Sequence, residues 1–173
     1  GHFGEALKYW GKANPGFVAP HDWHPLPFHS LDVAAVGFIY LERHPKFLGF
    51  FADLLGQPAA LVRQWLCFWL AVHDVGKFAL AFQGLRSDLL ERLQRRSATS
   101  LAYTIRHDTL GDFLWKDAFV RRLDPLTLDS ARARWKGAFS PWVAAVTGHH
   151  GQPPAVQGIF RDQHFKPVDE HAA

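Results

Sequence analysis

A histidine and an aspartate stand side by side at the end of an apolar run, in the stretch WLAVHDVGKFALAFQ at residues 69–83. A polar pair at the end of a buried helix is costly unless something satisfies it, and a metal ion would do so. Because neighbouring helical residues point about 100° apart, His73 and Asp74 could approach a binuclear centre from different directions, with Asp74 as the bridge. Lys77 follows three residues later, where it could hold a phosphate oxygen. The alternative is an ordinary polar pair at the rim of the core.

A second pair of histidines lies in TGHHG, residues 147–151. Two adjacent histidines in a regular helix do not aim comfortably at one ion. Gly148 and Gly151 free the backbone at the helix end, so that His149 and His150 could both turn inward. The alternative is a solvent-exposed turn.

Two further histidines begin expected helices. His29 lies in PFHSLDVAAVGFIYL, where Asp32, one turn later, could accept the hydrogen bond of its other ring nitrogen. His107 lies in TIRHDTLGDFLW beside Asp108, which could be no more than an acid at a helix start. Only convergence with the two motifs makes either histidine a ligand candidate. The histidines in loops or next to proline are expected at the surface: His21, His24, His44, His164 and His171.

The composition limits what can hold a metal. The chain has 11 histidines and a single cysteine, Cys67, which excludes a disulfide framework and a thiolate cluster. Imidazole and carboxylate ligands favour Mn²⁺, Fe²⁺, Co²⁺ or Ni²⁺ over Mg²⁺, although Mg²⁺ is possible. A net charge of +3 permits a polyanionic substrate. Candidates for contacts to such a substrate's backbone are Arg86, Arg92, Arg95, Arg96 and Arg106, each of which could equally be part of a solvated helix face.

Length and hydropathy indicate one cytoplasmic domain with an all-α fold. The 173 residues are 48% hydrophobic and 20% charged, which is enough for a substantial core. The apolar run before His73 has eight residues, far short of the roughly 20 of a membrane helix, so no membrane contact is expected. Helices are expected over 28–42, 47–55, 58–72, 87–96, 107–122 and 140–147, the last opened by Ser140-Pro141 and ended by Gly148. The buried stripe of the first is expected to be Leu31, Ala34, Ala35, Phe38 and Leu41. The tail from Gly151 carries no periodic pattern.

The segments YWGKA (9–13), HSLDVAAV (29–36), HDVGKFALAFQ (73–83) and PWVAAVTGHHG (141–151) resemble, in order, the HD nuclease domain of the CRISPR-associated nuclease-helicase. The resemblance implies a helical bundle with a metal site in a central cleft. It implies a metal-dependent nuclease that degrades single-stranded DNA, fed by a helicase, fused or separate, after a crRNA-guided surveillance complex has opened the target. It further implies one or two divalent ions, the first bound by His29, His73 and Asp74 and the second by Asp74, His107, His149 and His150. Lys77 would contact the phosphate.

The chain departs from the family pattern at one point. The family has a further aspartate, in a helix well downstream of GHHG, which completes the first metal site. Neither Asp162 nor Asp169 has that context. We therefore expect residues 1–173 to be one HD-type domain that lacks its C-terminal helices and any helicase that follows.

Two other functions are compatible with the same residues. An HD phosphohydrolase acting on nucleotides would need a closed pocket able to read a base. A catalytically silent docking module would bind the surveillance complex without a metal.

Overall fold

Most of the described chain is helical, as the spacing of apolar residues predicted. The computed structural model describes residues 2–14, 22–97, 102–119, 129–151, 154, 159 and 161–173. Its α-helices are α1 (His2–Ala6), α2 (Leu26–Arg43), α3 (Pro45–Leu55), α4 (Ala59–Val72), α5 (Leu80–Gln83), α6 (Ser87–Gln94), α7 (His107–Leu114), α9 (Asp129–Thr147), α10 (Arg161–His164) and α11 (Pro167–Ala172). Short 3₁₀ turns, η1 (Val75–Phe78) and η2 (Gly84–Arg86), follow α4 and α5, and a π-helical segment, η3 (Trp115–Phe119), extends α7. The all-α prediction is confirmed, with the small addition of antiparallel strands β1 (Trp10–Ala13) and β2 (Trp23–Pro25).

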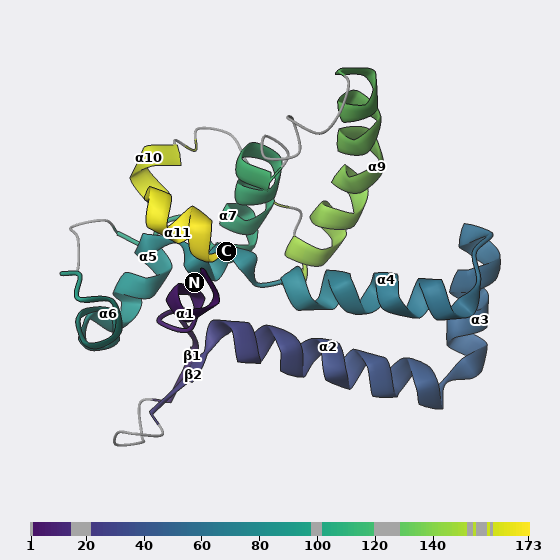
Figure 1. Ribbon diagram of the computed structural model, residues 1–173, viewed down its shortest axis with the longest axis horizontal. Helices are drawn as coiled ribbons and strands as arrows, with labels where there is room; N and C mark the ends of the chain where they lie inside the picture. Colours follow the sequence, from purple (N-terminus) through teal and green to yellow (C-terminus); the bar gives the residue numbers. More distant parts are fainter. Residues whose placement is uncertain are drawn as a thin grey trace.

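Helices α2 and α4 lie side by side and form a long arm that ends at α3 (Figure 1). The arm has its own small core around Leu41, Leu48 and Val62. At the other end of α4 the chain turns through η1, which packs against α7, while α9 contacts both α4 and α7. The larger core lies there, around Leu26, Phe78 and Leu110. The ends of several helices therefore meet at the base of the arm.

The two ends of the described chain are tied together by a buried carboxylate. Asp169 in α11 is fully buried, and its Oδ1 accepts a hydrogen bond of 2.8 Å from the hydroxyl of Tyr9. The same carboxylate pairs with Arg96 and accepts a 2.7 Å hydrogen bond from the backbone N–H of Lys166. Asp169 thus joins α11 to the segment around Tyr9 and to Arg96. The tail, for which the sequence showed no pattern, contains α10 and α11, and His164 in α10 is buried rather than at the surface.

The predicted buried stripe of α2 is wrong at most of its positions. Leu31 is 56% exposed and Phe38 is 39% exposed, and Ala35 is exposed as well, whereas Leu41 is buried. Helix α4 packs on another face of α2, the face that contains Gly37. A Cβ atom on Gly37 would collide with the side chain of Leu70 in α4. Because α2 is apolar on most sides, the spacing of its apolar residues does not show which face is buried. The face that packs on α4 is the one where glycine lets Leu70 approach.

Helix α9 runs without a break from Asp129 through Pro141, so the predicted helix start at Ser140-Pro141 is wrong. Proline inside a helix removes one hydrogen bond and crowds the carbonyl four residues earlier. Here that carbonyl belongs to Gly137, an exposed residue. The predicted helix end at Gly148 is confirmed.

Among the described residues, no single helix is long and apolar enough to cross a membrane. The bent pair Ala59–Phe78 and Leu80–Gln94 passes that test jointly, by length and composition alone.

Candidate metal centre

Four helix ends bring the predicted ligands together at the base of the arm. His73 directly follows the last residue of α4, and His149 and His150 follow the end of α9. His107 is the first residue of α7, and His29 lies in the first turns of α2. Figure 1 shows the end of α4 beneath α7 and α9. The histidines converge because one end of each of these helices lies next to Asp74.

The Asp74 carboxylate is the centre of the cluster and is only 2% exposed. Its Oδ2 lies 2.9 Å from Nε2 of His29, 3.1 Å from Nε2 of His73 and 2.7 Å from Nζ of Lys77. Adjacent ligands about 2.1 Å from one octahedral ion lie roughly 3 Å apart, so this spacing suits ligands of one metal ion. His29, His73 and Asp74 form a group whose donor atoms all lie within 4.8 Å of one another.

The other carboxylate oxygen faces a second group of imidazoles. Asp74 Oδ1 lies 3.3 Å from Nε2 of His107 and 3.6 Å from Nε2 of His149, and it is buried without a hydrogen-bond partner among the described residues. His150 Nε2 lies 3.1 Å from His107 Nε2. His107, His149 and His150 form the second group with donor atoms within 4.8 Å. A carboxylate with one such group on each oxygen has the form of a bridge between two ions.

The ring orientations of two histidines explain why a cation suits this place. Nδ1 of His73 lies 2.7 Å from the carbonyl oxygen of Leu70, and Nδ1 of His149 lies 2.9 Å from that of Val146. Because a carbonyl can only accept, each Nδ1 carries a proton, and a neutral ring then presents the lone pair of Nε2 to the Asp74 carboxylate. Two electron-rich atoms at this distance need an extra proton or a metal ion between them. The donor set therefore fits a divalent cation.

The charges around the cluster favour the ligand forms. Burial by itself would raise the pKa of Asp74, but its contacts with the imidazoles of His107 and His73 and the charge of Lys77 bring that pKa well below its usual range. Burial lowers the pKa of His29 despite its bond to Asp74. Burial, with the charge of neighbouring histidines, also lowers the pKa of His150. An ionised carboxylate beside neutral imidazoles is the protonation state that metal binding requires.

Gly76 allows the HD segment to approach α7. A Cβ on Gly76 would collide with the backbone carbonyl of His107 and the backbone nitrogen of Gly111. The side chains that flank this contact, Val75 and Phe78, are buried in the larger core. The glycine of HDVGK is therefore needed to bring His107 within reach of Asp74.

Lys77 lies against Asp74, and a buried glutamine holds the backbone around it. Besides its contact with Asp74, the Lys77 ammonium donates to the carbonyl of Gly11 at 3.2 Å, and its side chain is 12% exposed. Gln83 is fully buried; its amide donates to the carbonyls of Lys77 and Trp10 at 2.8 and 3.0 Å and accepts from the Trp10 N–H at 3.2 Å. Strand β1 and the turn carrying Lys77 are thus joined through one side chain. The sequence reasoning missed Gln83, although a lone amide in the apolar FALAFQ was a visible signal.

One sequence-based expectation about the surroundings is wrong, and the structure adds partners for most of the candidate arginines. Asp32 does not orient His29; its carboxylate contacts Nε2 of His24 at 2.9 Å in an exposed pair. Most of the arginines proposed for substrate contacts are paired with carboxylates: Arg86 with Asp88, Arg92 with Asp22, Arg96 with Asp169, and Arg106 with Asp108. The carboxylates offset part of the charge of these arginines, and contacts of the arginines with a substrate stay a prediction.

An all-helical fold, with adjacent His and Asp at the end of a core helix and further histidines converging on them, defines an HD-type domain with residues that could bind a metal. Residues 10–171 match the family described as Cas3, HD domain, and the chain belongs to that family.

Two relatives and one solved structure support this membership. The CRISPR-associated endonuclease/helicase Cas3 of Escherichia coli is 29% identical over 152 residues, which are 83% of this chain and 17% of that protein. The protein of the same name from Thermus thermophilus is 29% identical over 153 residues, 86% of this chain and 15% of the relative. A structure described as the crystal structure of a CRISPR-associated protein superposes with a TM-score of 0.69 and 26% identity, over 99% of this chain and 19% of that one. The chain thus spans less than a fifth of the length of the relatives it matches.

Proposed function

We propose that residues 1–173 are a nuclease domain that hydrolyses phosphodiester bonds of single-stranded DNA with one or two divalent metal ions. The observation that carries the proposal is the buried Asp74, which has imidazole nitrogens on both oxygens. His29 and His73 would hold one ion with Asp74. His107, His149 and His150 would hold the other, with Asp74 between them.

When bound, the ions supply charge neutralisation on the phosphate and an activated water at neutral pH. The residues of the chain supply the geometry. The Leu70 and Val146 carbonyls keep Nε2 of His73 and of His149 directed at the centre. An ammonium group has three N–H donors, and contacts to Asp74 and Gly11 account for two of those of Lys77 within the described residues. The third is left for a non-bridging phosphate oxygen, which fits the role proposed for Lys77.

The wider setting is inferred from the relatives. Their names combine an endonuclease with a helicase, and they are far longer than this chain. We therefore propose a helicase partner, fused or separate, that delivers single-stranded DNA, and recruitment by a crRNA-guided surveillance complex in the cytoplasm. Five histidines and one carboxylate favour Mn²⁺, Fe²⁺, Co²⁺ or Ni²⁺ over Mg²⁺ as the cofactor.

The test is metal quantification on the purified chain, followed by cleavage assays on circular single-stranded DNA and on mononucleotides with Mn²⁺ or Ni²⁺ added. We expect bound metal and cleavage of the circular DNA. The His73→Ala variant should lose both, whereas His24→Ala, which removes an exposed histidine paired with Asp32, should retain them. Hydrolysis of nucleotides alone would favour a phosphohydrolase, and a chain that neither binds metal nor cleaves after metal addition would favour a docking module.

A further inference from the structure

The ligand histidines are oriented in two different ways, depending on which end of a helix carries them. His73 and His149 follow the C-terminal ends of α4 and α9, and each ring donates to the carbonyl three residues earlier. The last carbonyls of a helix have no partner within the helix, so this acceptor is always present at a C-terminal end. His107 is the first residue of α7. At an N-terminal end the unpartnered groups are N–H donors, so the backbone of α7 offers His107 no such acceptor.

A tyrosine hydroxyl fills that role for His107. Tyr103 lies four residues before His107, and its hydroxyl oxygen accepts a 2.7 Å hydrogen bond from the His107 backbone N–H. The same oxygen lies 2.9 Å from Nδ1 of the His107 ring. The residue at the usual capping position, Arg106, makes no side-chain capping bond within the described residues. One phenolic oxygen therefore serves both the orphan N–H of the helix and the ring of its first residue.

We propose that Tyr103 is the positioning residue of His107: its hydroxyl holds the ring with Nε2 towards Asp74 and His150, and so determines the affinity of the second metal group. This inference rests on the proposed function. A hydroxyl can donate or accept, whereas a carbonyl only accepts. When Nε2 carries a proton, the Tyr103 O–H donates to Nδ1. When Nε2 binds a cation, Nδ1 carries the proton and donates to the Tyr103 oxygen. The ring keeps one orientation in both states.

The packing around Tyr103 makes the hydroxyl separable from the ring. The centroid of its ring lies 5.8 Å from the ring centroid of Phe82. The Phe82 centroid in turn lies 5.3 Å from that of His107. Tyr103 packs on the cluster formed by Trp10, Phe82 and Leu89. Phenylalanine at position 103 would keep these apolar contacts and remove only the oxygen.

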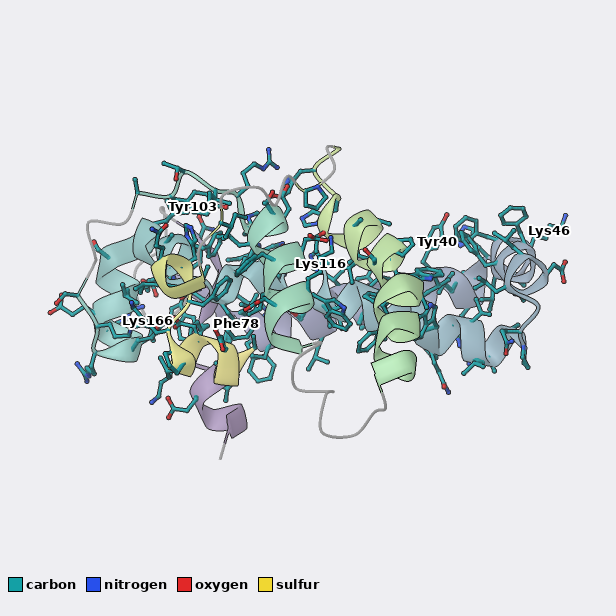
Figure 2. The ribbon with its side chains drawn as sticks, turned by 90° about the horizontal axis from the view of Figure 1, so that it is seen from above. Tyr40, Lys46, Phe78, Tyr103, Lys116 and Lys166 are labelled. Atoms are coloured by element: carbon teal, nitrogen blue, oxygen red, sulfur yellow. The ribbon has the colours of Figure 1, made fainter. Side chains whose placement is uncertain are left out.

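The experiment is a Co²⁺ titration of the metal-free chain, followed by calorimetry and by visible absorption of the bound ion. Removing a group that orients a metal ligand typically weakens metal binding 10–100-fold. We expect Tyr103→Phe to weaken one Co²⁺ site by that factor and to leave the His29, His73 and Asp74 site unchanged. Tyr40→Phe is the matched control, because Tyr40 is 50% exposed and Figure 2 shows it towards the opposite end of the molecule from Tyr103.

A double variant separates positioning from a general structural effect. If Tyr103 acts on the metal through His107, Tyr103→Phe should cause no further loss of Co²⁺ affinity in the His107→Ala background. Tyr103→Phe should still lower the thermal unfolding temperature in the His107→Ala background, because the backbone N–H of residue 107 loses its hydrogen-bond acceptor in both backgrounds. Unchanged Co²⁺ binding by Tyr103→Phe, or an equal loss of affinity in both backgrounds, overturns the inference while the proposed function stands. A wild-type chain that binds no Co²⁺ overturns both.

Discussion

The strongest test of the site is the removal of the Asp74 carboxylate, which lies against four of the five candidate histidines. In Asp74→Ala both groups would lose the oxygen ligand that we propose they share. Loss of a group that only orients a ligand already costs about 10–100-fold in metal affinity, so loss of a shared ligand should exceed 100-fold at each ion. We therefore expect no metal-dependent cleavage of single-stranded DNA by this variant.

The same substitution also has a cost to the fold, which the contact with Lys77 allows to be worked out. The two charges lie 2.7 Å apart, with side chains 3% and 12% exposed. At an effective dielectric constant of about 20, their attraction is about 6 kcal/mol, much of which desolvation offsets. Removing one partner of a buried pair typically costs about 3–5 kcal/mol, less than the total stability of most domains. Asp74→Ala should therefore fold, with a lower free energy of unfolding.

The assay combines denaturant unfolding in a chelator with metal titration and DNA cleavage. In Asp74→Ala/Lys77→Met the buried ammonium is removed as well, so most of the lost stability should return. Metal binding and cleavage should not return, because the carboxylate is still missing. Full, metal-stimulated cleavage by Asp74→Ala would refute the assignment of this residue as the bridge.

Two further predictions concern residues that shape the site, and a third concerns a buried histidine in α10. Gly76→Ala should lower the free energy of unfolding by about 1–3 kcal/mol or more and weaken Co²⁺ binding, because its Cβ would collide with the backbone of α7. Gly49→Ala, where a Cβ meets nothing within 4 Å, should change neither quantity in the same unfolding and titration measurements. Gln83→Leu should lower cleavage by disordering the turn that carries Lys77, with unchanged cleavage arguing against that role. Burial lowers the pKa of His164 below its ordinary 6.5, so the unfolded chain takes up this proton first as the pH falls. The contribution of neutral His164 to the free energy of unfolding should therefore be complete above about pH 6.5 and decrease below it. In His164→Leu the free energy of unfolding should decrease less between about pH 7.5 and 5.5.

Patterns in the sequence predicted the helical class, the HD pair and the two GHHG histidines, because these depend on local chemistry, whereas His29 and His107 became candidates only through the family resemblance. The HD pair after an apolar helix and the histidines between two glycines are recognisable from residue type and spacing alone. The structure brings His29, His73, His107, His149 and His150 around Asp74, while their binding of metal stays a prediction. The helix boundaries near Gly148 and around 107 also followed from local signals.

Local patterns failed where two surfaces had to be matched. Helix α2 is apolar on most sides, so only the packing of α4 at Gly37 determined which face is buried. Pro141 predicts a helix start by local rules, but the helix continues through it. Asp32 stands at the right spacing from His29, yet it pairs with His24.

By itself, the sequence determined which chemistry is available: imidazoles and a carboxylate in place of thiolates, on helices. Only the tertiary structure decided that these imidazoles gather around one carboxylate, because His29, His107 and His149 lie far from Asp74 in the sequence. Backbone carbonyls at two helix ends orient His73 and His149, and a tyrosine hydroxyl orients His107 at a helix start. These orienting groups lie only three or four residues from the histidines they contact. Residue spacing does not specify which distant helix ends pack together, because that depends on how whole helix surfaces fit.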